Sequence, residues 1–233
     1  MNTGNVYLIP SFLYDDAIET IPAYVVETVK SCQVFFVENE RSARRYLKKL
    51  WREMVIDNYQ WFTIHKAEQE VQDQFIRLSK EGKNIGIISE AGCPGIADPG
   101  QILVEAAQKI NATIKPLVGP SSILLALMAS GMNGQCFQFN GYLPIDNMTR
   151  KKMIRELEAD SIKRNCTQIF IETPYRNNQL LGDILQSCKE ETRVCIAVDI
   201  TSQTESIKTK TVKQWKKEVP DIHKKLCIFL LQS

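Results

Sequence analysis

The stretch "SEAGCPGIADPG", residues 89–100, has the composition of a ligand-binding loop. It holds three glycines and two prolines in twelve positions and directly follows the apolar run "NIGIIS". Glycines let a ligand approach the backbone, and prolines reduce the chain entropy that is lost on binding. Ligands of open α/β sheets bind beyond the carboxyl ends of strands. The stretch therefore predicts backbone recognition of a small polar molecule, and a mere turn is the alternative.

Motifs of other ligand sites are missing from the sequence. It contains neither G-x-G-x-x-G nor G-x-x-x-x-G-K-[ST], which argues against a dinucleotide fingerprint and a phosphate loop. Its seven cysteines are odd in number and scattered, which argues against a disulfide framework and a zinc site. We therefore expect no metal.

Short apolar runs alternate with helical patterns along the chain. Strands are predicted at 5–9, 34–38, 84–89, 112–118, 136–143, 167–173, 193–200 and 225–232. Helices are predicted at 16–30, 41–51, 66–83, 149–160 and 176–188. The alternation predicts the α/β class with mixed, largely parallel sheets and right-handed crossovers. Residues 201–217 fit either a strand pair or a loop and helix.

Length and charge predict a two-domain protein of the cytoplasm. The chain has 233 residues, and Pro116, Gly119 and Pro120 mark a hinge, so we expect α/β domains at 1–116 and 117–233. A net charge of +2 gives no overall attraction to nucleic acid or to an acidic membrane. The start lacks the pattern of a secretory signal, and no apolar run reaches the length of a membrane span. We therefore expect a cytoplasmic location.

Six motifs follow one another in a recognisable order. They are "GNVYLIP" (4–10), "VENERSARRYL" (37–47), "SEAGCPGIADPG" (89–100), "LVGPSSILLALMASG" (117–131), "FQFNGYLP" (137–144) and "IFIETPYR" (169–176). In content, order and spacing they resemble the tetrapyrrole methylase superfamily, and most closely its branch that methylates small-subunit ribosomal RNA. The resemblance implies a dimeric S-adenosylmethionine-dependent methyltransferase with the cofactor in a cleft between two domains.

The resemblance also implies which residues hold the cofactor. They are Pro10, Glu90, Ala91, Gly92, Pro94, Ile96, Ser121, Ser122, Ile171, Glu172, Val198 and Asp199. One point follows from the residues themselves. Ser121 or Ser122 can cap the helix "ILLALMAS" and direct its unpaired amides into the cleft, or can cap the helix and do nothing else.

The sequence departs from the resembled branch on the side that faces the acceptor. The family's "TPIGNL" is replaced by "IPSFLYDDAIET", "EDTR" by Glu38 to Arg41, and "YESPHR" by "IETPYR". Glu38 is the predicted general base, with an ion pair to Arg41 as its alternative role. Arg41 and Arg176 are predicted to bind the acceptor. His65 and His223 lie in no matching motif and are expected to be surface or strand-edge residues.

The acceptor stays open among three readings. The first is ribose 2′-O-methylation of small-subunit ribosomal RNA, the second methylation of a tetrapyrrole or other small molecule, and the third a cofactor-binding regulator without catalysis. Basic residues at 41–49 and 150–155 could contact RNA phosphates or form solvated faces. Tyr175 could stack on a base.

Overall fold

The computed structural model describes residues 3–64 and 68–233 and divides them into two compact units. The boundary between the two units falls between Ser121 and Ser122 in the sequence. The hinge expected after residue 116 falls at the end of a strand. The "GP" turn that follows packs against the first unit, since a Cβ added to Gly119 would lie 2.2 Å from Cβ of Pro10.

The first unit is built on a parallel sheet of five strands. The strands are β1 (Asn5–Ile9), β2 (Val34–Val37), β3 (Gln60–Thr63), β4 (Ile85–Ile88) and β5 (Thr113–Pro116), in the order β3-β2-β4-β1-β5. The continuous apolar runs of β2 and β4 are buried along their whole length, as in sheets covered on both faces. The four predicted strands are confirmed. β3 was not predicted, because its short "QWFT" run at the sheet edge carries little apolar signal.

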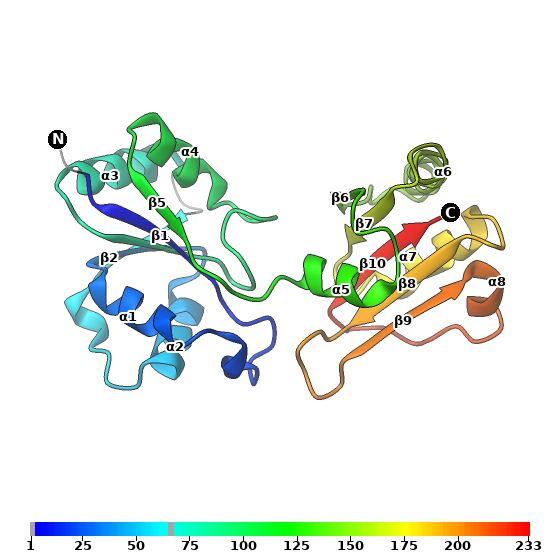
Figure 1. The fold of residues 1–233 in the computed structure, drawn as a ribbon, viewed down its shortest axis with the longest axis horizontal. Helices are drawn as coiled ribbons and strands as arrows, with labels where there is room; N and C mark the ends of the chain where they lie inside the picture. Colours follow the sequence, from blue (N-terminus) through cyan, green and yellow to red (C-terminus); the bar gives the residue numbers. More distant parts are fainter. Residues whose placement is uncertain (1–2, 65–67) are drawn as a thin grey trace. The chain divides into compact units, whose positions relative to one another are not determined.

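Helices cover both faces of this sheet (Figure 1). They are α1 (Tyr24–Ser31), α2 (Glu40–Leu50), α3 (Glu68–Lys80) and α4 (Gln101–Lys109), with short 3-10 turns η1 (Ile18–Thr20) and η2 (Ile56–Asn58). The helix predicted from residue 16 begins only at Tyr24, because Pro22 cannot continue a helix that precedes it. Residues 66 and 67 of the third predicted helix lie outside the described residues.

The crossovers make β4 the natural place for a ligand site. Val29 of α1 and Leu47 of α2 pack in one core cluster, whereas Phe75 of α3 and Leu103 of α4 pack in another, on the opposite face. The chain therefore leaves β1 and β2 toward one face and leaves β4, which lies between them, toward the other. Adjacent strands that diverge in this way open a crevice at their carboxyl ends.

The second unit holds a mixed sheet. Its strands are β6 (Phe137–Tyr142), β7 (Thr167–Ile171), β8 (Arg193–Val198), β9 (Ser206–Thr211) and β10 (Cys227–Gln232), in the order β6-β7-β10-β8-β9. Only the pairing of β6 with β7 is parallel, since β10 inserts antiparallel between β7 and β8 and is buried throughout. The predicted α/β class with mixed sheets is confirmed, and the parallel part lies mainly in the first unit.

The helices of the second unit also follow the sequence pattern. They are α5 (Ser122–Ser130), α6 (Asn147–Arg164), α7 (Asn177–Ser187) and α8 (Val212–Trp215). The ambiguous segment 201–217 contains one strand, β9, followed by the short helix α8. The Thr211 side chain accepts a hydrogen bond from the Gln214 amide, and the Gln214 side chain accepts one from the Thr211 amide, so a capping box stops the strand and starts the helix.

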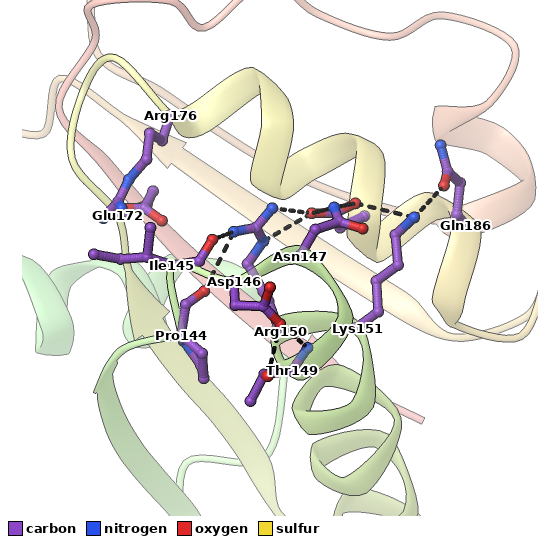
Figure 2. A network of polar contacts seen from close by, with 11 residues as sticks. Pro144, Ile145, Asp146, Asn147, Thr149, Arg150, Lys151, Glu172, Arg176 and Gln186 are labelled. Atoms are coloured by element: carbon purple, nitrogen blue, oxygen red, sulfur yellow. Dashed lines mark hydrogen bonds and ion pairs between the residues drawn. The ribbon is translucent and has the colours of Figure 1, made fainter.

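Arg150 fits neither of the two roles considered for the basic residues at 150–155, RNA phosphate contact or a solvated face. Its side chain is 1% exposed and forms an ion pair of 2.5 Å with Asp183 of α7. It also donates to the carbonyl oxygens of Pro144 and Ile145, at 3.2 and 2.7 Å (Figure 2). A guanidinium used in this way cannot reach RNA. It fixes the turn between β6 and α6 onto α7.

Candidate functional site

A pocket of about 140 Å³ lies at the crevice beside β4. Its wall comes from the end of β1, the first turns of α2 and the end of β4. The lining residues are Ser11, Phe12, Asp15, Ser42, Ala43, Arg45, Tyr46, Ser89 and Glu90. All of them belong to the first unit, and the glycine-rich stretch begins at its edge.

An isolated antiparallel bridge joins Ser11 to Gly92 and so ties the end of β1 to the loop. The Ser11 N–H donates to the Gly92 carbonyl at 2.8 Å, and the Gly92 N–H donates back at 3.1 Å. The buried Ser11 hydroxyl adds a bond of 2.8 Å to the Ser89 carbonyl. The start of the loop is therefore held in place by hydrogen bonds to Ser11.

Glycine is required at position 92 for two reasons. Its φ is +73°, a backbone conformation that side chains with a Cβ rarely adopt. An added Cβ would also lie 3.3 Å from Cδ2 of Leu13 and 3.4 Å from the Pro120 carbonyl oxygen. The backbone here is therefore closely approached by two other segments of the same unit.

Asp98 closes the second half of the loop. Its Oδ1 accepts the N–H groups of Gly95 and Gly100, at 2.9 and 2.7 Å. Within the described part of the chain, its buried Oδ2 has no hydrogen-bond partner. Burial raises the pKa of the carboxyl, and the two amide bonds offset only part of that rise. Burial, followed by the charge of Asp98, also raises the pKa of the Cys93 thiol, which disfavours a nucleophilic thiolate there.

Two glutamates connect the loop to β2 and α2. Glu38 follows β2, and its Oε1 accepts the N–H of Glu90 at 3.0 Å. The Glu90 carboxylate accepts a short hydrogen bond from the hydroxyl of Ser42 in the first turn of α2. That turn is capped by Asn39, whose Oδ1 accepts the N–H groups of Arg41 and Ser42 at 3.0 and 3.3 Å. The positive end of the helix dipole thus stabilises the carboxylate of Glu90.

Pro10 is fixed from two sides. The hydroxyl of Tyr46 donates to its carbonyl oxygen at 2.5 Å. Burial raises the pKa of Tyr46, so this phenol is a neutral donor. The Gly119 backbone covers the Pro10 ring so closely that no side chain would fit at position 119.

Most basic residues of α2 have partners within the first unit. Arg44 pairs with Glu40 and lies over Trp61, Lys48 donates to two backbone carbonyls, and Lys49 donates to the Asp15 carbonyl at 2.8 Å. Arg45 lines the pocket and lies 3.4 Å from Asp15. Arg41 is exposed, and its side chain has no ion pair in the described ranges. It is therefore the cation of α2 that is most available to a ligand.

In the second unit, Glu172 and Arg176 form a partly buried pair after β7. The side chain of Glu172 is 1% exposed and that of Arg176 is 25% exposed, with 2.6 Å between Oε1 and the guanidinium. The same oxygen accepts the Thr173 N–H at 2.6 Å. Arg176 is thus engaged by Glu172, while the neighbouring Tyr175 is 71% exposed with its ring against His223.

The other predicted residues of this unit gather at the same sheet edge. Ile171 of β7 and Ala197 of β8 both pair with Ile228 of β10. Ile171 and Val198, the last residues of β7 and β8, therefore lie at the same end of the sheet on either side of β10. Asp199 adopts a φ of +47°. Its carboxylate accepts the Leu226 N–H at 3.1 Å and the Lys225 ammonium at 2.8 Å. In the described structure Asp199 therefore ties down the loop that enters β10.

The structure thus assembles the predicted residues in two separate groups. The first unit brings together Pro10, Glu38 and the loop residues Glu90, Ala91, Gly92, Pro94 and Ile96. The second unit brings together Ile171, Glu172, Arg176, Val198 and Asp199, while Ser122 begins α5 directly after Ser121. Ser11, Ser42 and Asp98 were missed, although Ser42 stands at the third helical position after Asn39, a typical capping spacing.

Two kinds of site are not found in the part of the chain that the structure describes. No group of three or more His, Cys, Asp or Glu side chains gathers there as a metal site would require. No helix among these residues has the length and apolar character of a membrane span. His65 lies outside the described residues, and the exposed His223 contacts Tyr175.

The chain is similar to several proteins named ribosomal RNA small subunit methyltransferase I. That of Buchnera aphidicola from Schizaphis graminum is 31% identical over 227 residues, which cover 96% of this chain and 76% of the relative. That of Vibrio cholerae is 35% identical over 63% of this chain and 50% of its own length. That of Bacillus subtilis is 29% identical over 91% of this chain and 68% of its own. No family model matches the chain.

Two solved structures share the fold. The methyltransferase CobJ superposes with a TM-score of 0.64 at 14% identity and covers all of this chain and 95% of CobJ. Uroporphyrin-III-C-methyltransferase from Thermus thermophilus superposes with a TM-score of 0.55 at 13% identity, over 98% of this chain and 92% of the neighbour. These likenesses confirm the predicted fold.

Proposed function

The chain belongs to the ribosomal RNA small subunit methyltransferase I family, and from this membership we propose that it methylates a ribose 2′-hydroxyl of small-subunit ribosomal RNA with S-adenosylmethionine as donor. The predicted family is confirmed, and the alternative of a tetrapyrrole acceptor is not favoured by the curated relatives. The observation that carries the proposal is the braced glycine loop at the carboxyl end of β4.

The residues of this loop fit the amino-acid end of the proposed cofactor. Gly92 lets the loop pack closely against Leu13 and Pro120, and Glu90 offers a carboxylate to an ammonium group. The loop needs no ordering on binding, because Ser11 and Asp98 already hold both of its halves. We propose Pro10, Glu90, Ala91, Gly92, Pro94, Ile96 and Ser121 as the contacts of the first unit, and Ser122, Ile171, Glu172, Val198 and Asp199 as those of the second.

The acceptor chemistry asks for a positioned hydroxyl and a base. S-adenosylmethionine supplies a methyl group on a sulfonium, which a nucleophile takes by in-line displacement. Positioning supplies much of the rate, on the order of 7–11 kcal/mol for a well-oriented pair. A ribose hydroxyl is a weak nucleophile and gains roughly 10²–10⁴-fold from a base. We propose Glu38 as that base, since it follows β2 and its carboxylate already contacts the cofactor loop.

The two predicted arginines receive different proposed roles. Arg41, exposed at the start of α2, is proposed to bind an acceptor phosphate. Arg176 is held by the buried Glu172, so we propose that it positions the turn at 172–176 and contacts the acceptor only from that fixed place. Its exposed neighbour Tyr175 is proposed to stack on a base.

The test is transfer of label from methyl-labelled S-adenosylmethionine. The purified chain is incubated with small ribosomal subunits and, separately, with a tetrapyrrole precursor. We expect label in the RNA, at a position where the phosphodiester resists alkaline hydrolysis because the 2′-hydroxyl is blocked. Label in the tetrapyrrole would show that the acceptor is a tetrapyrrole and not RNA. Label in neither substrate, with cofactor binding intact, would favour a regulator without catalysis.

Assembly and location complete the proposal. We propose a homodimer in the cytoplasm, as the family resemblance implies. Light scattering at micromolar concentration is expected to give twice the chain mass of 26.6 kDa. A mass of one chain would contradict the dimer and leave the proposed reaction to be judged by the transfer assay.

A further inference from the structure

Residues 206–225 carry a local excess of positive charge. The segment contains seven lysines and two acidic residues, although the net charge of the whole chain is only +2. It comprises β9, α8 and the loop that leads to β10. Lys208, Lys216, Lys217 and Lys224 are exposed and have no ion pair among the residues that the structure describes. A local basic surface therefore exists where the overall charge predicts none.

The two faces of β9 differ. Thr209 points toward α5, where its hydroxyl donates to the Ser130 carbonyl at 2.7 Å. Ser206, Lys208 and Lys210, which alternate with it, line a pocket of about 260 Å³. β9 is the last strand of its sheet, so this pocket opens beside a strand edge.

This pocket, here called the β9 groove, combines an apolar lining with a cationic rim. Its apolar lining includes Val198 and the nearly buried Trp215 and Ile222, and Glu218, Val219 and Pro220 also line it. Trp215 is locked, because its Nε1 donates to the Val194 carbonyl at 2.8 Å. Val198, proposed above as a cofactor contact, also lines this groove, so the two proposed sites share this residue.

The two lysines of the rim are held differently. The Lys210 ammonium lies 4.7 Å from the centre of the Trp215 ring and 3.0 Å from Oε2 of Glu218. Lys208 is exposed, yet its charge helps to lower the pKa of Glu218, after the hydrogen bond and the charge of Lys210. The residues that line the groove thus include two lysines and one carboxylate, which leaves a positive excess there.

Protection of the sheet edge is the simpler role for such lysines. Lysines that only prevent an exposed strand edge from pairing with another strand need neither a groove nor an aromatic ring beside them. Here Lys210 is partly buried against Trp215, and apolar residues line the same hollow as the two lysines and the loop 218–220. A hollow with an apolar lining and cations at its rim matches a nucleotide, whose base is apolar on its faces and whose phosphate is anionic.

We propose that the β9 groove binds single-stranded RNA, with backbone phosphates on Lys208 and Lys210 and a base against the lining, as a substrate contact in addition to the proposed methyl-transfer site. The proposal rests on the proposed function, because it takes RNA as the acceptor. It assigns the substrate a second anchoring surface, on the second unit, in a segment that no family motif covers.

Fluorescence anisotropy with a fluorescein-labelled 20-nucleotide single-stranded RNA tests the groove. The double variant Lys208→Gln/Lys210→Gln is compared with Lys80→Gln/Lys109→Gln, which removes the same charge from exposed lysines of α3 and α4 in the first unit. Each lost phosphate contact lowers the slope of log affinity against log salt by about 0.7, so the groove variant should lose about 1.4 and bind about tenfold more weakly at low salt. The control should keep the wild-type slope.

Lysine acetylation of the wild-type protein, read by mass spectrometry, gives the same answer without a variant. The RNA should protect Lys208 and Lys210 and leave Lys80 and Lys109 reactive. Equal salt slopes in both variants, or protection by S-adenosylmethionine instead of RNA, would overturn the groove assignment. If wild type still transfers label to small subunits, the proposed function survives that result. If wild type neither binds RNA nor transfers label, both proposals fail.

Discussion

Ser11 and Gly92 face each other across a two-bond antiparallel bridge that joins the end of one parallel strand to the loop after another. The bridge fixes the loop in a form that favours glycine at position 92, where φ is +73°. Because the bridge uses both the N–H and the carbonyl of Gly92, this buried point braces the loop, and contacts to a ligand fall to the residues on either side of it.

Gly92→Ala should weaken S-adenosylmethionine binding about tenfold or more, and Gly92→Val should abolish it, because the Cβ enters the space beside Leu13 and Pro120. Gly131→Ala is the matched control, since Gly131 has a φ of +67° with nothing within 4 Å. Both alanine variants should lose about 1–2 kcal/mol of stability from the left-handed backbone. Calorimetry that finds wild-type cofactor affinity in folded Gly92→Val would refute the site.

Asp98→Asn should change how stability depends on pH. Burial raises the folded pKa of Asp98 above its ordinary value of 3.8, so its protonated form favours the fold. That contribution is present below the unfolded pKa and is lost as pH rises through the folded pKa. Asparagine keeps the acceptor for Gly95 and Gly100, so the variant should gain stability relative to wild type as pH rises from about 4 to 7.

Asp146→Asn supplies the contrast of opposite sign. Asp146 caps α6, and its hydrogen bonds to Thr149 lower its pKa. Its contribution is therefore present above the unfolded pKa and is lost as pH falls, so this variant should lose stability relative to wild type as pH rises. Urea denaturation across the pH series measures both differences, and parallel curves for the two variants would contradict the assigned shifts.

Asp183→Asn should destabilise the second unit by about 3–5 kcal/mol, because it leaves the buried Arg150 guanidinium without its counter-charge. The exposed pair of Lys152 and Glu156 on the same helix provides the comparison, and Glu156→Gln should cost at most about 0.5 kcal/mol. Hydrogen exchange of α6 and α7 reports the difference. A cost for Asp183→Asn that matches the exposed pair would show that Arg150 is not the clamp of the 144–147 turn.

The fold could be predicted from the sequence where a continuous run of residues has a clear pattern of its own. The strands at 34–37 and 85–88 are continuous apolar runs, and such runs predict strands buried on both faces. The edge strand Gln60–Thr63 could not be predicted because it is short and half-exposed. The antiparallel insertion of β10 could not be predicted because strand order within a sheet is set by contacts between residues far apart in the sequence.

Individual side-chain roles were harder to predict than elements. Arg150 belongs to a basic run in the sequence, yet a single aspartate 33 positions away makes it a core residue. The lysines at 208 and 210 gain their groove only through Trp215 and the loop 218–220. Spacing along one strand shows which residues share a face, but it does not show which segment packs opposite them.

Arg41→Ala should weaken RNA binding or turnover and leave S-adenosylmethionine affinity nearly unchanged, because Arg41 lies in the first turn of α2, outside the loop proposed to hold the cofactor. Arg52→Ala, which removes an exposed arginine just after the same helix, is the control. Loss of one phosphate contact should reduce the log-log salt slope by about 0.7 to 1, whereas a small carboxylate acceptor would show a shallow slope throughout. Collapse of cofactor binding in Arg41→Ala, with acceptor binding retained, would reverse the assignment of this arginine to the acceptor.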